Sequence, residues 1–224
     1  MAEDLVAELA KRLDARAGEA TRTWWNRYLK GAIEFRGVPM AGVREVVHGL
    51  WRERELDERP REDQLRVVLA LFAQPYAEDK LAAILVLGER LLDDLGAPDV
   101  PFLAEPFRRG HVADWSTCDW YCVKVLARLL ERAPDAAEAI AAWHAAPNLW
   151  QRRAAAVSFV RLARHGDARL PNLTGLVLEV CAANVRDPQR FSQTSVGWVL
   201  RELSHAEPAV VAAFVDEHSE LMST

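Results

Sequence analysis

The sequence is poor in cysteine and tyrosine and has no long hydrophobic run. It contains three Cys and three Tyr among 224 residues. An odd number of cysteines without a paired framework argues against a disulfide scaffold and indicates reduced thiols in a cytoplasm. No run approaches the roughly 18 apolar residues of a membrane-spanning helix. The N-terminus alternates charged and apolar residues and does not resemble a signal peptide. We therefore expect a cytoplasmic protein that makes no membrane contact.

Common catalytic and metal-binding signatures are also missing. The sequence has no phosphate-cradling glycine loop, no histidine pair at metal-ligand spacing and no serine in a nucleophile-elbow pattern. Cys118 and Cys122 are one helical turn apart, but no further ligand lies near them in the sequence. We expect no metal site, and we expect these thiols to pack in the core.

The charge is uneven along the chain, although the formal net charge is only −5. Residues 150–201 hold eight arginines against three acids, a net charge of +5, which leaves −10 for the remainder. Such a segment can form a local binding surface for phosphate. Solvated helix faces are the alternative, and charge alone favours them.

Apolar residues recur at spacings of three and four along nearly the whole chain, for example in "VREVVHGLW" and "WYCVKVLARLL". This periodicity predicts helices, and no segment shows the sustained alternation of a strand. Short breaks rich in Pro, Gly, Asp and Asn separate the helices. We predict an all-α fold, an α-solenoid of about a dozen antiparallel helices of about ten to eighteen residues in degenerate HEAT-like pairs. Without a composition shift that marks a linker, we expect one domain over residues 1–224.

Three segments carry the chemical signals that remain. "DWSTCDWYC" places Trp115 and Asp119 four residues apart, on one face of a helix. "NLWQRRAAA" carries Arg153, and "SQTSVGWVLRE" carries Trp198. Gly197 lies beside that tryptophan, and a glycine inside a helix usually marks a close approach by another group. For each tryptophan taken alone, core packing is the alternative.

These three motifs, in this order and at this separation, resemble those of the AlkD-type DNA glycosylases. That family consists of HEAT-like solenoids that excise alkylated purines. Its pattern of Trp and Asp four residues apart, an Arg in Asn-x-Trp-x-x-Arg-Ala-Ala, and a Trp in Gly-Trp-Val-Leu-Arg-Glu falls on four residues here, namely Trp115, Asp119, Arg153 and Trp198. The N-terminal "RYLKGAIEFRGVPMAGVRE" resembles the family more weakly. The resemblance therefore covers nearly the whole chain.

The resemblance implies a role for each matched residue. Asp119 would stabilise the positive charge that develops on the deoxyribose and would orient or deprotonate the attacking water. Trp115 and Trp198 would pack on the sugar and backbone as further catalytic residues. The residues expected to contact DNA along a concave face are Arg153, Arg161, Arg201, Tyr28 and Lys30.

The resemblance also implies the class of substrate. The expected partner is double-stranded DNA that contains cationic N3- or N7-alkylated purines. The family acts without flipping the base and admits bulky adducts, and it needs no cofactor. We expect a monomer that associates with the nucleoid.

Two departures from the family pattern put lesion preference in doubt. Ser116 stands where the best-known pattern has an acid, and larger residues follow Asp119. Two other classes of protein stay open, namely a non-catalytic HEAT-like protein that binds damaged or branched DNA and a protein-interaction scaffold.

The other residues of the first motif have structural interpretations. Asp114 is expected to cap the helix that begins at Trp115. Trp120 and Tyr121 are expected to lie in the core.

Overall fold

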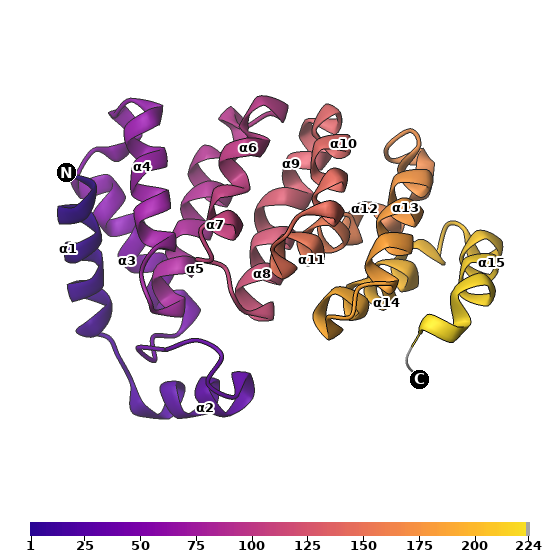
Figure 1. The fold of residues 1–224 in the computed structure, drawn as a ribbon. Coiled ribbons are helices and arrows are strands. Elements are labelled where there is room, and N and C mark those ends of the chain that lie inside the picture. Colours follow the sequence, from indigo (N-terminus) through magenta and orange to yellow (C-terminus); the bar gives the residue numbers. More distant parts are fainter. Residues whose placement is uncertain (223–224) are drawn as a thin grey trace. The chain divides into compact units, whose positions relative to one another are not determined.

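The fold is built from α-helices joined by short turns (Figure 1). A computed structural model describes residues 1–222. Over these residues it contains no strand, and the one β-bridge joins Glu34 and Tyr76. The all-α fold class is confirmed, and successive packed helices agree with an α-solenoid. The concave DNA-binding face stays a prediction.

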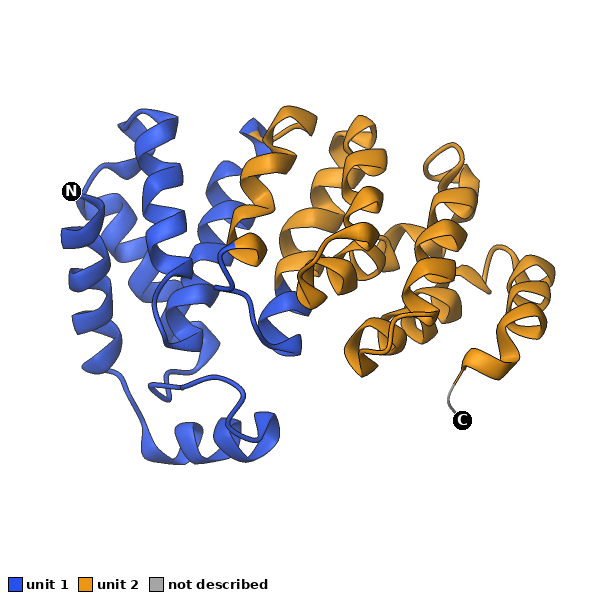
Figure 2. Ribbon diagram, in the orientation of Figure 1, with its two compact units in different colours: residues 1–94, 109–120 blue, residues 95–108, 121–224 orange. Residues whose placement is uncertain are grey.

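The chain divides into two compact units whose segments alternate along the sequence (Figure 2). Unit 1 comprises residues 1–94 and 109–120, and unit 2 comprises residues 95–108 and 121–224. The expectation of one domain over residues 1–224 remains a prediction.

Unit 1 contains the N-terminal helices and the start of the helix that begins at Trp115. Its α-helices are α1 (Ala2–Asp14), α2 (Glu19–Leu29), α3 (Met40–Glu53), α4 (Arg61–Phe72), α5 (Ala77–Val86) and α8 (Trp115–Tyr121), whose last residue is assigned to unit 2. The shorter segments are the 3-10 turns η1 (Leu56–Glu58) and η3 (Leu92–Asp94) and the π-helical η2 (Leu87–Leu91). Helices α1, α3, α4 and α5 pack on one another and form the core of this unit.

Unit 2 contains more short helices. Its α-helices are α6 (Val100–Leu103), α7 (Glu105–Arg108), α9 (Ala127–Arg132), α10 (Ala137–Ala141), α11 (Leu149–Val157), α12 (Val160–Ala163), α13 (Leu173–Val185), α14 (Arg190–Leu203) and α15 (Pro208–His218). The π-helical η5 (Cys122–Leu126) leads from α8 into α9, and the 3-10 turns are η4 (Ala97–Asp99), η6 (Pro134–Ala136), η7 (Ala142–Ala145), η8 (Gly166–Ala168) and η9 (Ser219–Leu221). Helix α14 packs on α11, α12 and α13.

Local chemistry explains where two of the helices that matter for function begin. Asp114 accepts a hydrogen bond of 2.9 Å from the Thr117 backbone N–H, so the predicted cap of α8 is confirmed. Asn148 caps α11 by accepting from the N–H groups of Trp150 and Gln151, and its amide donates to the Phe107 carbonyl. Both caps satisfy backbone donors that a helix start leaves unpaired.

The neighbouring residues of "DWSTCDWYC" mostly take the structural roles expected of them. Cys118 and Cys122 are fully buried free thiols, as predicted. Tyr121 is buried as well, with its ring stacked on Phe107 and its hydroxyl donating to the Leu103 carbonyl. Trp120 is only half-buried, so the core prediction is confirmed for Tyr121 alone.

A buried lysine links the start of α5 to the end of α4. Lys80 is 6% exposed and donates to the carbonyls of Phe72 and Gln74 at the end of α4, each at 2.7 Å. Burial lowers its pKa to about 8, against the opposing attraction of Asp114 and Asp79. The lysine therefore favours its neutral form more strongly in the fold than in the unfolded chain.

This pKa predicts how stability depends on pH. Between pH 8 and the unfolded pKa of about 10.5 the unfolded chain binds more protons than the native chain, so stability rises with pH there. We expect the free energy of unfolding of the wild type, relative to Lys80→Met, to rise by about 2 kcal/mol from pH 7 to pH 9.5. Denaturant unfolding of both proteins at the two pH values measures it. A difference that stays constant, or falls, would contradict this account of Lys80.

Candidate DNA-binding and catalytic residues

The α8 segment presents Trp115 and Asp119 on successive turns of one helix. Both side chains are half-buried, and therefore neither is sealed in the core. Trp115 packs against a cluster of Leu29, Phe35 and Ala77. This packing holds the Trp115 indole in place. Asp119 lies one helical turn further along α8, on the same face as that indole.

Helix α2 brings a second predicted residue to the same indole. Tyr28 is 52% exposed, and its ring meets that of Trp115 edge-on, with centroids 5.4 Å apart. Lys30 caps α2 in the left-handed conformation and is exposed. In unit 1 the structure therefore gathers Trp115 and Tyr28, with Asp119 and Lys30 on the same two helices.

A buried polar network holds the loop that carries α2. The Glu78 carboxylate accepts hydrogen bonds of 2.8–3.0 Å from the backbone N–H groups of residues 36–38. The Arg36 guanidinium pairs with Asp14 at 2.6 Å and with Asp79 at 2.7 Å. Burial raises the pKa of Asp79, opposed by that arginine. Because almost every member is buried, this network specifies one position for the loop.

The position of Arg153 differs from the one expected of a residue that contacts phosphate. It is 6% exposed, and its Nη1 donates to the Phe191 carbonyl at 2.8 Å and to the Thr194 hydroxyl at 3.0 Å. These bonds tie α11 to the N-terminal part of α14, and Trp150 packs on Phe191 beside them. The structure therefore gives Arg153 a role in positioning α14, and phosphate binding by this residue stays a prediction.

Helix α14 carries Gly197, Trp198 and Arg201 in the order that the sequence indicates. Trp198 is half-buried, and the Arg201 side chain is 68% exposed, paired only at 3.4 Å with its neighbour Glu202. Apart from its chain neighbours and the backbone of its own helix, no atom of the described residues lies within 4 Å of the place that a Cβ on Gly197 would take. The close approach predicted at this glycine is therefore not made by the protein, and the space beside it is open.

Two arginines predicted to contact DNA differ in their availability. Arg161 is exposed but pairs with Glu131 at 3.1 Å, and this carboxylate would compete with a phosphate. Within residues 1–222, Arg201 meets no such competitor beyond the weak contact with Glu202. Of the two, Arg201 has the better geometry for an incoming anion.

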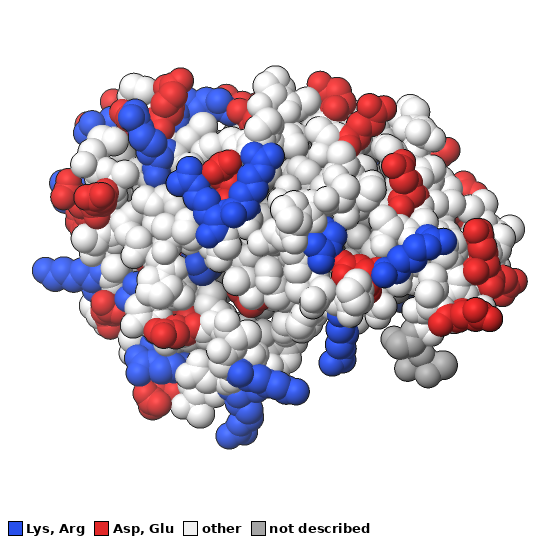
Figure 3. All heavy atoms as spheres, in the orientation of Figure 1, with Lys and Arg blue, Asp and Glu red and all other residues white. Residues whose placement is uncertain are grey.

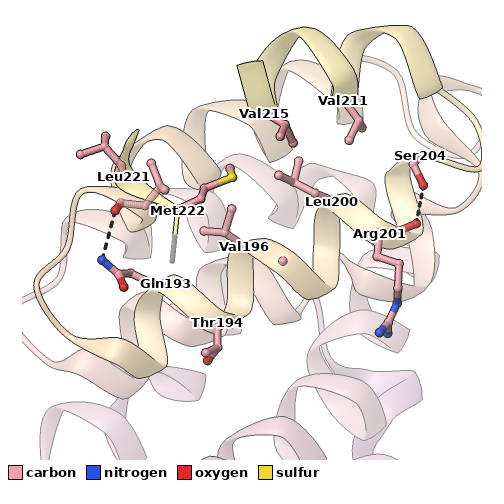
Figure 4. Close-up of a pocket in the computed structure, with 12 residues that line it drawn as sticks. Gln193, Thr194, Val196, Leu200, Arg201, Ser204, Val211, Val215, Leu221 and Met222 are labelled. Atoms are coloured by element: carbon pink, nitrogen blue, oxygen red, sulfur yellow. Dashed lines mark hydrogen bonds between the residues drawn. The ribbon is translucent and has the colours of Figure 1, made fainter. Parts of the chain in front are cut away.

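A cavity of about 490 Å³ lies beside α14 in unit 2 (Figure 4). Gly197 and Arg201 line it together with apolar residues of α14 and α15, and Figure 4 shows Arg201 pointing away from Val211 and Val215. Among the described residues no group of three or more His, Cys, Asp or Glu side chains could hold a metal ion. Among the same residues no helix is long and apolar enough to span a bilayer.

The sequence profile of a family described as DNA alkylation repair enzyme matches residues 9–224. The chain belongs to this family. A solved structure described as a predicted DNA alkylation repair enzyme from Enterococcus faecalis is 19% identical and superimposes with a TM-score of 0.75, covering 90% of each chain. At this identity the likeness is one of fold. No curated protein matches the chain.

Membership of the DNA alkylation repair family supports a role in alkylation repair, with DNA as the partner. The resemblance inferred from "DWSTCD", "NLWQRRAAA" and "VGWVLRE" is confirmed at the level of the family. None of these findings tests the roles of the individual residues. Those roles remain predictions from the motifs and the geometry described above.

Helix α2 also carries an exposed aromatic residue, Trp24, that none of the sequence motifs identifies. Trp24 is 56% exposed, yet "TWWNRY" gives two adjacent tryptophans that both look like core residues. Adjacent residues on a helix are about 100° apart, so only one of the two can face the core of this unit. That spacing was the signal that could have identified it.

Proposed function

We propose that this protein is a DNA glycosylase of the 3-methyladenine and 7-alkylguanine type. It would hydrolyse the N-glycosidic bond of cationic N3- or N7-alkylated purines in duplex DNA, without flipping the base and with bulky adducts among its substrates. The observation that carries the proposal is Asp119 on α8, one turn after Trp115, with both side chains half-buried on a positioned surface.

The proposed reaction breaks the bond between C1′ of the deoxyribose and the purine nitrogen. The alkylated base leaves as a neutral purine and takes the bonding electrons, which cancels its positive charge. Positive charge then develops on the sugar, where a carboxylate stabilises it. Water adds to C1′ and loses a proton to Asp119 or to solvent.

The remaining residues would hold the substrate. The faces of Trp115 and Trp198 favour a nearby cation, here the developing oxocarbenium ion. Arg201, Arg161 and Lys30 would contact phosphates, and Arg153 would do so beside its role in holding α14. The alternative is a non-catalytic protein that uses these residues to bind damaged or branched DNA.

One experiment separates these alternatives. Duplex DNA carrying N7- or N3-methylpurine is incubated with the protein, and released base is measured, with Asp119→Asn alongside. Release that is lost in the variant supports catalysis by this carboxylate. Binding without release favours the non-catalytic protein, and the absence of both favours a protein-interaction scaffold.

We also propose that the protein acts as a cytoplasmic, nucleoid-associated monomer. Sedimentation of the free protein and of its DNA complex tests the oligomeric state. Imaging of a fluorescent fusion with and without an alkylating agent tests the location.

Substitution of Gly197 is expected to change the stability of the protein and its affinity for DNA in opposite directions. Gly197→Ala is expected to raise the free energy of unfolding by up to about 1 kcal/mol, because the helix gains propensity and, apart from chain neighbours and the helix's own backbone, no atom of the described residues lies within 4 Å of the new methyl group. The same methyl group is expected to weaken DNA binding, because it fills the space open to an approaching backbone. Thermal unfolding and DNA-binding titrations measure the two effects.

Gly49→Ala in α3 is the matched control. Its new methyl group would meet only Glu53 Oε1, at 3.7 Å. This control should gain similar stability and keep its DNA affinity. Equal DNA affinity in both variants would argue against a DNA contact at Gly197.

A further inference from the structure

An exposed aromatic pair on α2 is the feature of unit 1 that the proposed reaction does not explain. Trp24 and Tyr28 are 56% and 52% exposed, and their rings stack with centroids 5.2 Å apart and an interplanar angle of 15°. Tyr28 in turn meets Trp115 edge-on. A continuous aromatic surface therefore runs from Trp115 outward to Trp24.

The neighbouring tryptophan shows that Trp24 is not needed to hold α2 in place. Trp25 stacks on Phe35 with centroids 5.3 Å apart and an interplanar angle of 7°, and it packs on the cluster that includes Leu29. Its edge contact with Trp24, at 4.7 Å, supports the outer ring from one side. The anchoring function of α2 is thus served by Trp25 and Leu29, and Trp24 presents its indole to solvent. Two stacked and exposed aromatics of this kind indicate a binding surface.

The charges at this end of α2 indicate what binds there. Arg27 and Lys30 are exposed, and neither makes an ion pair with a residue that the structure describes. The one acid of the helix, Glu19, lies in its first turn and pairs with Arg22. In Figure 3, Lys and Arg side chains extend from the region of α2. A flat apolar ring beside unneutralised cations fits a nucleotide, which has an apolar face and a phosphate.

We propose that Trp24 and Tyr28 form a stacking platform for one nucleotide unit of DNA, with Arg27 and Lys30 on the adjacent phosphate. The inference rests on the proposed function in one respect, namely that DNA runs along Trp115. The unit that stacks is the ring of an unpaired base or the deoxyribose face of the duplex backbone. Trp24 thereby extends the binding surface beyond the residues that the family motifs identify.

Binding to undamaged DNA tests the platform without any base release. Fluorescence anisotropy is measured with a labelled duplex, the same duplex carrying a one-nucleotide bulge, and the single strand. Trp24→Ala is expected to raise the Kd at least about fivefold for one or more of these DNAs, the lower end for one stacked unit. A larger loss with the bulge and the single strand assigns the platform to an unpaired base, and an equal loss with the plain duplex assigns it to the deoxyribose.

Three further variants complete this test. Trp24→Phe keeps a flat ring and should retain most of the affinity. Thr23→Ala, an exposed neighbour on the same helix, should bind like the wild type. Arg27→Gln should reduce the slope of log Kd against log salt by about 0.9, the value for one phosphate contact, and this readout does not depend on Trp24.

Other outcomes would overturn the proposal. Affinities within twofold of the wild type for Trp24→Ala on all three DNAs would remove the platform. A wild-type dimer in sedimentation that becomes a monomer in Trp24→Ala would assign the surface to a second copy of the chain. Loss of base release in Asp119→Asn is read in a different assay, so failure of the glycosylase proposal and failure of this one are distinguishable.

Discussion

Replacing Asp119 by Asn is expected to reduce the single-turnover rate of alkylpurine release by about 100- to 10,000-fold. The substitution keeps the size and shape of the side chain and removes its negative charge, which would stabilise the cationic sugar and accept a proton from water. Because Asp119 is half-buried on α8 rather than in the core, the fold should survive the change. Single-turnover release at saturating protein separates this loss from an effect on binding.

The matched control for this variant is Asp135→Asn, the same isosteric loss of charge at an exposed position of unit 2. It should release base at the wild-type rate. Affinity for undamaged duplex should be retained or slightly raised in Asp119→Asn, since a negative charge near DNA is removed. Release within tenfold of the wild type would exclude Asp119 as the principal catalytic group.

Gly37→Ala is expected to destabilise the protein by about 3 kcal/mol or more and to weaken DNA binding. Gly37 has φ +94°, and a Cβ on it would lie 2.2 Å from the Gly18 carbonyl oxygen and 3.0 Å from the backbone nitrogen of Arg22. The Gly18 N–H donates to the Gly37 carbonyl at 3.0 Å, so this is where α2 is fastened to the rest of the unit. A side chain here combines backbone strain with overlap against backbone atoms, which cannot move aside as a flexible side chain can.

Gly31→Ala separates these two causes. Gly31 also has a positive φ, +73°, but apart from its chain neighbours no atom of the described residues lies within 4 Å of its added Cβ. It should therefore cost about 1 kcal/mol, the strain alone. Denaturant unfolding and DNA titration of both variants measure the difference. Equal losses would mean that the contact between Gly18 and Gly37 does not hold α2.

Apolar periodicity predicted the helical elements, and the residue type and place of Asp114 predicted the cap of α8, because both depend on a few neighbouring residues. The division into two units was not predictable. Pro- and Gly-rich breaks recur at similar intervals throughout the chain, and nothing local marks residues 95–108 as part of a different unit. The π-helical turns were missed for a similar reason, since they preserve the apolar spacing of the helices that they continue.

For the candidate site, the sequence predicted the position of a residue only where motif spacing determines its place on a helix. Trp115, Asp119 and Arg201 lie where motif spacing puts them on their helices. The burial of Arg153 was not predictable from the sequence. Arginine is usually a surface residue, and its burial here depends on a hydrogen bond to the Phe191 carbonyl, 38 positions away. The exposure of Trp24 was not predicted, since hydrophobicity alone does not say which of two adjacent indoles faces outward.

The alternation of the two units along the chain has a consequence for synthesis on the ribosome. Unit 1 is not complete after its first 94 residues, because it still lacks residues 109–120. That late segment brings Trp115, which packs against the cluster at the base of α2. The nascent chain must therefore expose 95–108, a part of the other unit, before the first unit can close. The side of this cluster that Trp115 covers therefore stays exposed on the emerging chain for that interval.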